Sequence, residues 1–326
     1  MNRQLFTWKF IKKNVEQDIP VILLYVLESK GSSPGRQGFF MAVNANREME
    51  GSIGGGIMEH KFVEMAKEKL QAASSKPQVK QQIHDKSAGK NQSGMICSGE
   101  QTIFIYRVRR DDISHIENLI TSLEQNRNGT LRLTPEGILF EDVVTEKDFE
   151  INLKSENDPI AIGWKYTERT GYKNQLYIIG GGHCALAFSR LMSSMDFYIH
   201  LFEDREGLNT MDTNDYVHSK TIVKDYSGLS SLVPSGENNY VVIMTFGYRT
   251  DDIAVRALMN KKFKYFGLLG SKKKIEKMFD DYRKEGVDGE TLKRIHSPIG
   301  IPIKSQTPEE IAVSIAAEII KVKNEQ

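Results

Sequence analysis

The chain has 326 residues, which is long for a single hydrophobic core and predicts two domains. It carries 44 Lys and Arg against 43 Asp and Glu, so the formal net charge of +1 leaves no excess charge to hold a nucleic acid. With 27% charged and 39% hydrophobic residues, the composition excludes a disordered or fibrous chain.

No segment of the sequence indicates a membrane span or an export signal. The longest apolar run, 21–27, is far shorter than the roughly 20 residues that a membrane helix needs. Residues 1–14 mix basic and aromatic side chains and lack the apolar core of a signal peptide. Cys97 and Cys184 form no CxxC pair, so neither a zinc site nor a disulfide framework is indicated. We expect a cytoplasmic protein with no nucleic-acid or membrane partner.

The first half of the chain predicts an α+β domain. Polar residues at 155–158, closed by Pro159, are typical of a linker, so we place the domains at 1–171 and 172–326. The elements predicted before this boundary are strands at 21–27, 41–43, 49–53, 102–108, 130–133 and 137–140, helices at 60–73 and 111–125, and a loop at 85–93.

The second half predicts a doubly wound parallel sheet of the Rossmann-like kind, because short apolar strands alternate with helical segments. The predicted strands are 176–179, 198–202, 221–223, 240–245 and 265–269. The last helix has the clearest start signal. Thr307 is a suitable N-cap, Pro308 suits the first helical position, and Glu310 completes a capping box.

The first strand of this sheet runs into a glycine turn, Gly180-Gly181-Gly182, which opens a helix at His183 and fits G-x-G-x-x-A. Such glycines let a phosphate approach the backbone at a helix N-terminus. Glu203 ends the second strand, where it would meet a ribose hydroxyl, and Asp204 and Arg205 follow it. Two interpretations stay open for this unit: a nucleotide-like ligand, or glycines that only allow tight packing.

Two further loops follow the fourth and fifth strands, at 245–251 and 267–272, where ligands bind in open parallel sheets. Gly270 and Ser271 precede Lys272 at a helix start, which is consistent either with an anion contact or with a solvated basic turn. His183 either meets a ligand or caps its helix. For Cys184, inside that helix, we expect a packing role.

Domain one has its own glycine loop, Gly54-Gly55-Gly56, between a strand and a helix. Three glycines in succession cost chain entropy, so the loop predicts a close approach to the backbone and a second anion cradle. Glu59 lies in the first helical turn, where it either accepts from a ring N–H or only complements the helix dipole. Upstream, Arg36 stands in a glycine-rich loop that is either a phosphate contact or simply mobile.

Cys97 lies among small residues at 93–100, which favours an accessible sulfur. A thiolate is a soft ligand for a metal such as molybdenum or copper and can carry sulfur, although an ordinary buried cysteine is the alternative.

Taken together, these motifs resemble the XdhC/CoxI family, the accessory factors of xanthine dehydrogenase and related molybdenum hydroxylases. The blocks that carry the resemblance are 31–34 with Gly38 and Met41, 51–56 with Glu59, 94–97, 180–183, 203–205, 267–271, 297–300 and 307–315.

The resemblance implies a homodimeric chaperone, not an enzyme, that binds molybdenum cofactor, protects it while a terminal oxo group is exchanged for sulfur, and delivers it to an apo-hydroxylase. A cysteine desulfurase is a second implied partner. Three positions depart from the family pattern: Ile57 and Tyr248 stand where cysteine and histidine are frequent, and Ser98 replaces a glycine. Cys97 is therefore the only thiol of that half.

Our primary hypothesis places the cofactor in one pocket between the two glycine loops, with Cys97 facing the molybdenum. The residues predicted to contact it are Gly54, Gly55, Gly56, Glu59, Cys97, Gly180, Gly181, Gly182, His183, Glu203, Arg205, Gly270 and Ser271. The alternatives are an NAD-dependent oxidoreductase, since Glu203 suits an unphosphorylated ribose, and a regulatory nucleotide sensor.

Overall fold

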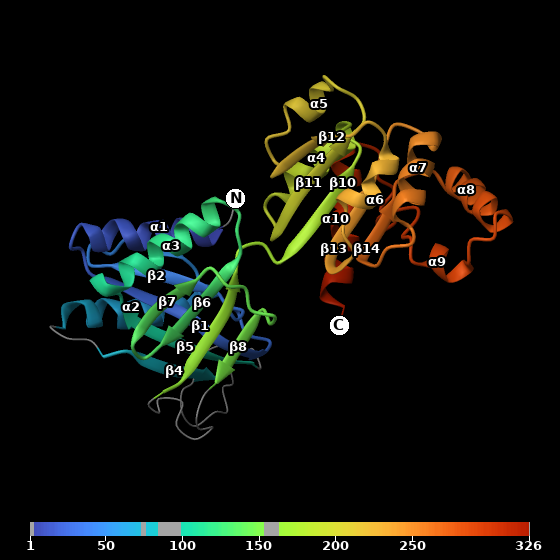
Figure 1. The fold of residues 1–326 in the computed structure, drawn as a ribbon. Helices are drawn as coiled ribbons and strands as arrows, with labels where there is room; N and C mark the ends of the chain where they lie inside the picture. Colours follow the sequence, from blue (N-terminus) through green and yellow to red (C-terminus); the bar gives the residue numbers. More distant parts are fainter. Residues whose placement is uncertain (1–2, 73–75, 84–98, 153–162, 326) are drawn as a thin grey trace. The chain divides into compact units, whose positions relative to one another are not determined.

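The computed structural model describes residues 3–72, 76–83, 99–152 and 163–325. The chain separates into two compact units, Asn2–Gly171 and Tyr172–Gln326 (Figure 1). Each unit has its own hydrophobic core.

The N-terminal unit is an α+β domain with two antiparallel sheets. Its strands are β1 (Val21–Gly31), β2 (Phe40–Asn44), β3 (Met49–Gly51), β4 (Gln78–Ile83), β5 (Gly99–Arg107), β6 (Gly129–Thr134), β7 (Gly137–Glu141), β8 (Phe149–Asn152) and β9 (Lys165–Thr170). Its helices are α1 (Arg3–Glu16), α2 (Gly56–Gln71) and α3 (Ile113–Glu124), the last preceded by the short 3₁₀ turn η1 (Arg110–Asp112).

The first of these sheets has the strand order β3-β2-β1-β5-β4, and the second has the order β7-β6-β9-β8. Strand β1 is buried along most of its length because both faces of its sheet are covered. Ile22 and Leu24 pack with Met58 and Phe62 of α2, whereas Leu23 on the other face joins the core of α1, α3 and the second sheet. The sheet that contains β1 is therefore the middle layer of this unit, with α2 on one face and α1, α3 and the second sheet on the other.

The C-terminal unit alternates strands and helices. Its strands are β10 (Asn174–Ile179), β11 (Phe197–Glu203), β12 (Ser219–Ile222), β13 (Gly236–Ile243) and β14 (Phe263–Leu268). Its helical segments are α4 (His183–Met192), α5 (Asn209–Asp212), η2 (Tyr226–Gly228), α6 (Leu229–Leu232), α7 (Tyr248–Leu258), α8 (Lys272–Lys284), α9 (Gly289–Lys293) and α10 (Pro308–Asn324).

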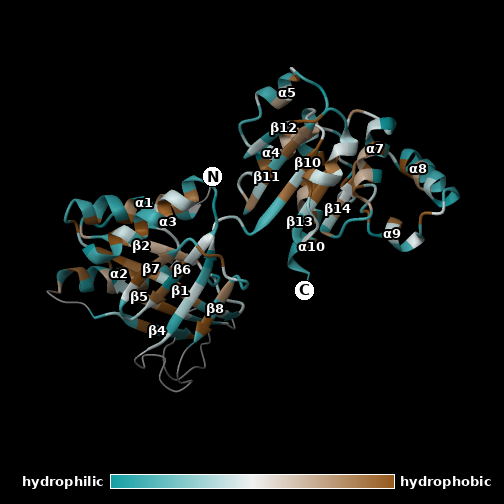
Figure 2. Cartoon of the chain, viewed as in Figure 1, coloured by the Kyte–Doolittle hydropathy of each residue, from teal (hydrophilic) through white to brown (hydrophobic). Residues whose placement is uncertain are grey.

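These five strands pair in parallel in the order β12-β11-β10-β13-β14. Helices α4 and α10 cover one face, where Ile178 and Val242 are buried, and α6 to α9 cover the other, where Ile179 and Ile243 are buried. Figure 2 shows the hydrophobic residues concentrated in these central strands. The predicted fold class, an α+β domain followed by a doubly wound Rossmann-like sheet, is confirmed.

Most predicted elements are present with shifted ends. Helix α2 begins at Gly56 rather than at residue 60, so the third glycine of the loop is already its first residue. Thr307 caps α10 and forms the predicted capping box with Glu310. In the N-terminal unit, helix α1 and strands β4, β8 and β9 were not predicted, and the three strands are polar or short. The loop predicted at 85–93 and the linker at 155–158 lie outside the described residues.

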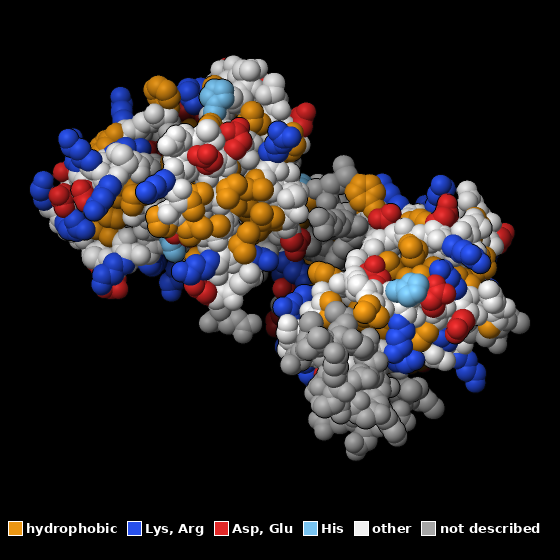
Figure 3. Space-filling model, turned by 180° about the vertical axis from the view of Figure 1, so that it is seen from behind, with side chains coloured by type: hydrophobic (Ala, Val, Ile, Leu, Met, Phe, Trp, Pro, Cys, Tyr) orange, Lys and Arg blue, Asp and Glu red, His pale blue; other side chains and the backbone are white. Residues whose placement is uncertain are grey.

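Within the part of the chain that the structure describes, every helix is too short or too polar to cross a bilayer. Acidic and basic side chains are interspersed over the face seen in Figure 3, and hydrophobic side chains gather in one area of the C-terminal unit.

Candidate functional site

The carboxyl ends of β10, β11, β13 and β14 lie at one edge of the parallel sheet. Strand β10 is the first of the unit, and the chain builds β11 and β12 on one side of it and β13 and β14 on the other. The order reverses between β10 and β13, and ligands of open α/β sheets bind outside the strands at such a point. The glycine turn after β10 and residues 245–247 after β13 flank it.

The three glycines of this turn have different reasons to be glycine. Gly180 has a φ of +105°, and a Cβ there would lie 2.5 Å from the carbonyl oxygen of Met244. Gly181 is also packed, since its Cβ would lie 3.2 Å from a carboxylate oxygen of Glu203. Gly182 differs, because its φ is −71° and its Cβ would meet nothing within 4 Å. Packing explains the first two glycines, whereas the third faces open space at the start of α4.

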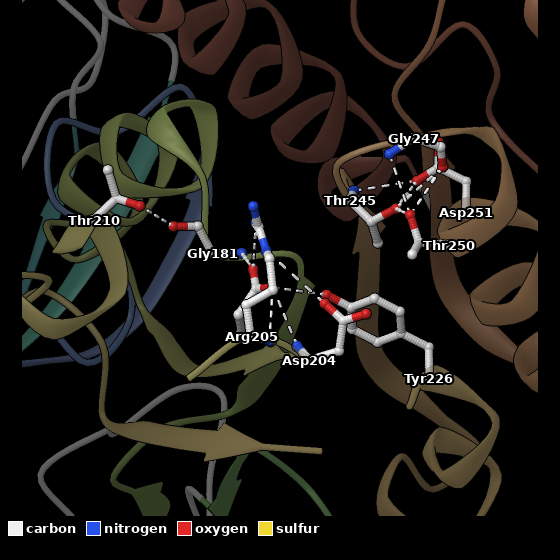
Figure 4. A network of polar contacts seen from close by, with 10 residues as sticks. Gly181, Asp204, Arg205, Thr210, Tyr226, Thr245, Gly247, Thr250 and Asp251 are labelled. Atoms are coloured by element: carbon white, nitrogen blue, oxygen red, sulfur yellow. Dashed lines mark hydrogen bonds and ion pairs between the residues drawn. The ribbon is translucent and has the colours of Figure 1, made fainter. Parts of the chain in front are cut away.

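Glu203 lies at the end of β11, as predicted, but its carboxylate is bound within the chain by Gly181 and Arg205, which Figure 4 labels. The side chain is 0% exposed and accepts hydrogen bonds from the Gly181 N–H at 2.6 Å and from Arg205 Nε at 2.7 Å and Nη2 at 3.1 Å. Burial alone would raise the pKa of Glu203, but the hydrogen bonds from Arg205 and Gly181 outweigh burial and lower this pKa to about 2. The structure thus differs from the interpretation in which Glu203 accepts from a ribose.

Arg205 and Phe246 are two accessible side chains at this edge. The Arg205 side chain is 41% exposed, and its guanidinium carbon lies 5.4 Å from the centroid of the Phe246 ring. Phe246 follows β13 and is 86% exposed. From the sequence, Phe246 was included only as part of the loop at 245–251. The signal that sequence reasoning missed is an aromatic residue just after a strand, at a position that is not packed in the hydrophobic core.

A second polar network, shown in Figure 4, joins Thr245 and Gly247 to Thr250 and Asp251 and fixes the loop on both sides of residue 246. The Asp251 side chain is 0% exposed. Its carboxylate accepts hydrogen bonds from the backbone N–H of Thr245 at 3.1 Å and from the Thr245 hydroxyl at 2.6 Å. Thr250 binds the Thr245 hydroxyl at 2.6 Å and accepts from the Gly247 N–H at 3.2 Å. Lys274 pairs with Asp251 from α8. Sequence reasoning missed this ion pair because its two members are 23 residues apart in the chain.

The other predicted residues of this unit have local roles. Ser271 caps α8 by accepting from the Lys274 N–H at 3.4 Å, and a Cβ on Gly270 would lie 3.0 Å from the Lys274 side chain. His183 is exposed and lies with residues of α10 along a groove between the helices. Cys184 packs against the core beneath α4, in line with the packing role expected for it, and burial raises the pKa of its thiol.

In the N-terminal unit, the glycine loop is likewise bound by a carboxylate of the same chain, that of Glu59. Glu59 Oε2 accepts from the Ser52 hydroxyl at 2.7 Å and from the N–H groups of Ile53 at 3.1 Å and Gly55 at 3.0 Å. The predicted anion cradle therefore already holds an anion that belongs to α2.

The glycines of this loop again divide into packed and open positions. Gly54 has a φ of +124°, and its Cβ would lie 2.4 Å from the backbone nitrogen of Gly35, so the glycine-rich loop at 31–38 packs directly onto it. Gly55 and Gly56 have φ values of +76° and +69°, and nothing lies within 4 Å of their Cβ positions. These two glycines are required by the backbone conformation and leave open space in front of it.

The exposed Arg36 guanidinium donates to the Gly31 carbonyl at 3.2 Å, a contact within its own loop. Cys97 lies outside the described residues, so its predicted contact with a metal stays a prediction. Among the residues that are described, no group of three or more His, Cys, Asp or Glu side chains is arranged to hold a metal ion.

The strand order and the glycine turn define the C-terminal unit as a Rossmann-type domain with a candidate ligand edge. Residues 176–319 match the XdhC Rossmann domain, and residues 15–81 match the XdhC and CoxI family. The chain belongs to the XdhC/CoxI family, as its sequence motifs indicated.

Curated relatives match different extents of the chain. The uncharacterized protein YqeB of Escherichia coli K12 is 25% identical over 314 residues, which cover 95% of this chain and 44% of YqeB. A protein of Bacillus subtilis described as a probable xanthine dehydrogenase subunit is 32% identical over 82 residues, 25% of this chain and 23% of that protein. The chain spans less than half the length of both relatives.

A solved structure shares the fold. The crystal structure of a xanthine dehydrogenase from Bacillus halodurans superimposes with a TM-score of 0.70, covers 98% of this chain and 97% of its own, and is 19% identical in sequence.

Proposed function

We propose that this chain is an accessory protein of a molybdenum hydroxylase of the xanthine dehydrogenase type. The observation that carries the proposal is family membership in both units, through the XdhC and CoxI match at 15–81 and the XdhC Rossmann match at 176–319. Two similar proteins are themselves described as a xanthine dehydrogenase or a probable subunit of one.

In this proposal the chain binds molybdenum cofactor as its cargo, supports the sulfuration of the metal, and hands the cofactor to the apo-enzyme. The cofactor supplies a phosphate, a pterin ring and the metal. The open backbone at Gly182 fits the approach of a phosphate, because a Cβ there would project into free space. At the N-terminal loop the Gly55 N–H already donates to Glu59, so this loop is a weaker candidate for the phosphate. Cys97 is the proposed thiol contact, and a homodimer and a cysteine desulfurase are further proposed partners.

The direct test is to express the full chain in a host that makes the cofactor and to measure molybdenum and pterin fluorescence in the purified protein. We expect both in wild type and a large loss in Gly182→Ala, whose new methyl group meets no protein atom. Cys97→Ala should keep pterin and lose molybdenum retention or sulfuration. Wild-type protein that carries neither component, and binds none added in excess, would exclude the proposal.

A dinucleotide-dependent oxidoreductase is the second candidate, because the strand order and the glycine turn are those of dinucleotide-binding sheets. Against it, the acid that would meet the ribose is engaged by Gly181 and Arg205. Titration with NADH followed by turnover screening separates the candidates: an oxidoreductase turns over, a nucleotide sensor binds without turnover, and a cofactor chaperone binds the pterin.

A further inference from the structure

Phe246 is the most exposed large hydrophobic residue in the part of the chain that the structure describes, at 86%. A phenyl ring in water forgoes the burial that normally stabilises it. The backbone that carries the ring is nevertheless fixed, since its neighbours Thr245 and Gly247 are bound through Asp251 and Thr250. An exposed aromatic ring on a fixed loop at the ligand edge of a parallel sheet is a platform on which another planar ring can stack.

Arg205 backs this ring. Its guanidinium carbon lies 5.4 Å from the Phe246 centroid, and two of its nitrogens are held by the fully buried carboxylate of Glu203. The spacing is too close for a third layer between the two groups, because stacked layers need roughly 3.5 Å each. A ligand ring therefore meets the open face of Phe246, with the guanidinium against the other.

The platform lies close to the open glycine of the turn. A Cβ on Gly180 would lie 2.9 Å from the Cα of Thr245, so the two strand ends touch. Since consecutive Cα atoms are about 3.8 Å apart, Gly182 and Phe246 lie within about 16 Å of each other. One ligand that joins a planar ring to a phosphate can reach both.

We propose that Phe246 is a binding residue that stacks a planar heteroaromatic ring of a phosphate-bearing ligand, that Arg205 braces the phenyl ring, and that Glu203 positions Arg205 and does not contact the ligand. The ligand class is a phosphorylated purine or pterin. This inference deepens the proposed function. It rests on that function only if the ligand is a pterin, because a purine ligand does not require it.

The test measures binding of four probes to the full chain by calorimetry: NADH, ADP-ribose, dihydroneopterin triphosphate, and pyrophosphate, which has no ring. Base stacking on an aromatic side chain contributes enough that its loss weakens binding by about tenfold to a hundredfold. We expect Phe246→Leu to weaken at least one ring-bearing probe by that factor and to leave pyrophosphate unchanged, and Phe246→Tyr to restore the affinity.

Phe6→Leu is the matched control. Phe6 is another exposed phenyl ring, at 47%, and it lies on α1 of the N-terminal unit. It should change no affinity. Unaltered melting of Phe246→Leu shows that the fold is intact, as its exposure requires.

The outcomes separate this inference from the proposed function. Purine binding that depends on Phe246, without pterin binding, supports the inference and contradicts the cofactor proposal. Pterin binding that is indifferent to Phe246→Leu supports the cofactor proposal and overturns the inference. The inference is also overturned if wild type binds no ring-bearing probe.

Discussion

Two glutamates, Glu59 and Glu203, satisfy the backbone of the two glycine loops with their own carboxylates. Glu59 accepts from the N–H groups of Ile53 and Gly55, and Glu203 accepts from that of Gly181. Each acid replaces the anion that a glycine turn at a helix start otherwise attracts. At both loops a glycine beyond the carboxylate, Gly56 or Gly182, has open space at its Cβ position.

Glu203→Gln tests how much this carboxylate stabilises the C-terminal unit. The glutamine side chain keeps the shape of the carboxylate but loses the charge that holds Arg205. Its NH2 group must also face an N–H donor in place of an accepting oxygen. We expect a loss of about 1–3 kcal/mol of unfolding free energy, measured by urea denaturation at pH 7.

Asp204→Asn is the control for that substitution. The Asp204 side chain is 25% exposed and lies 4.0 Å from Arg205 Nε, so the loss of its charge should cost less than about 1 kcal/mol. Equal effects of both substitutions would contradict the assignment of Glu203 as the acid that anchors the turn.

At the scale of elements, the turn between β10 and α4 contains two glycines that packing requires, Gly180 and Gly181, and a third, Gly182, that packing does not require. Gly180→Ala should cost at least about 3 kcal/mol, because its φ is +105° and the new methyl group would overlap the Met244 carbonyl. Gly182→Ala should cost at most about 1 kcal/mol, as an ordinary change at a helix N-cap.

Thermal melting followed by circular dichroism distinguishes the two variants. If Gly182→Ala destabilises the unit as much as Gly180→Ala, the third glycine is structural and its value as a binding probe is lost.

The sequence predicted elements whose signal is local. The strand pattern of β10 and the capping box of α10 are contained in a few consecutive residues, and both predictions are confirmed. Strands β8 and β9 were missed because their residues are largely polar, and they form only through pairing with each other and with β6. Their stability comes from tertiary contacts that a short window does not contain.

The candidate site divides in the same way. The positions of the glycine turn and of Glu203 were predictable because strand ends of a parallel sheet meet at one edge. The bond between Glu203 and Gly181 was not predictable, since it depends on the rotamer of a side chain 22 residues away. Phe246 was overlooked because the exposure of an aromatic residue follows from the packing of the whole sheet.

At the scale of the whole molecule, the two units have separate cores and should respond to pH separately. The C-terminal unit contains two histidines that are held neutral, His200 and His218, and burial is the main cause that lowers the pKa of each to about 4. His218 Nδ1 accepts from the Ile199 N–H at 2.9 Å, so protonation at that atom would break the bond.

His200 is enclosed in a similar way. Its ring nitrogens lie 2.9 Å from Ser219 Oγ and from Gln175 Oε1, and its ring stacks on Tyr177 with a centroid distance of 4.6 Å. All of these groups are uncharged, so none of them offsets the cost of burying an imidazolium with a negative charge.

Because both histidines have lower pKa values in the folded state than the usual value near 6.5, the unfolded chain binds more protons between about pH 6.5 and pH 4. The C-terminal unit should therefore lose stability as the pH falls through this window. The slope is at most about 1.4 kcal/mol per pH unit for each histidine, and partial exposure reduces it.

The two tryptophans of the chain, Trp8 and Trp164, both lie in the N-terminal unit, so their fluorescence follows that unit alone, while far-ultraviolet circular dichroism follows both. At pH 5 we expect part of the circular dichroism signal to be lost at a lower urea concentration than at pH 7, ahead of the fluorescence change. The double variant His200→Gln, His218→Gln should show a smaller shift between the two pH values. A wild-type C-terminal unit that unfolds at the same urea concentration at pH 5 and pH 7 would show that these imidazoles are not held neutral by the fold.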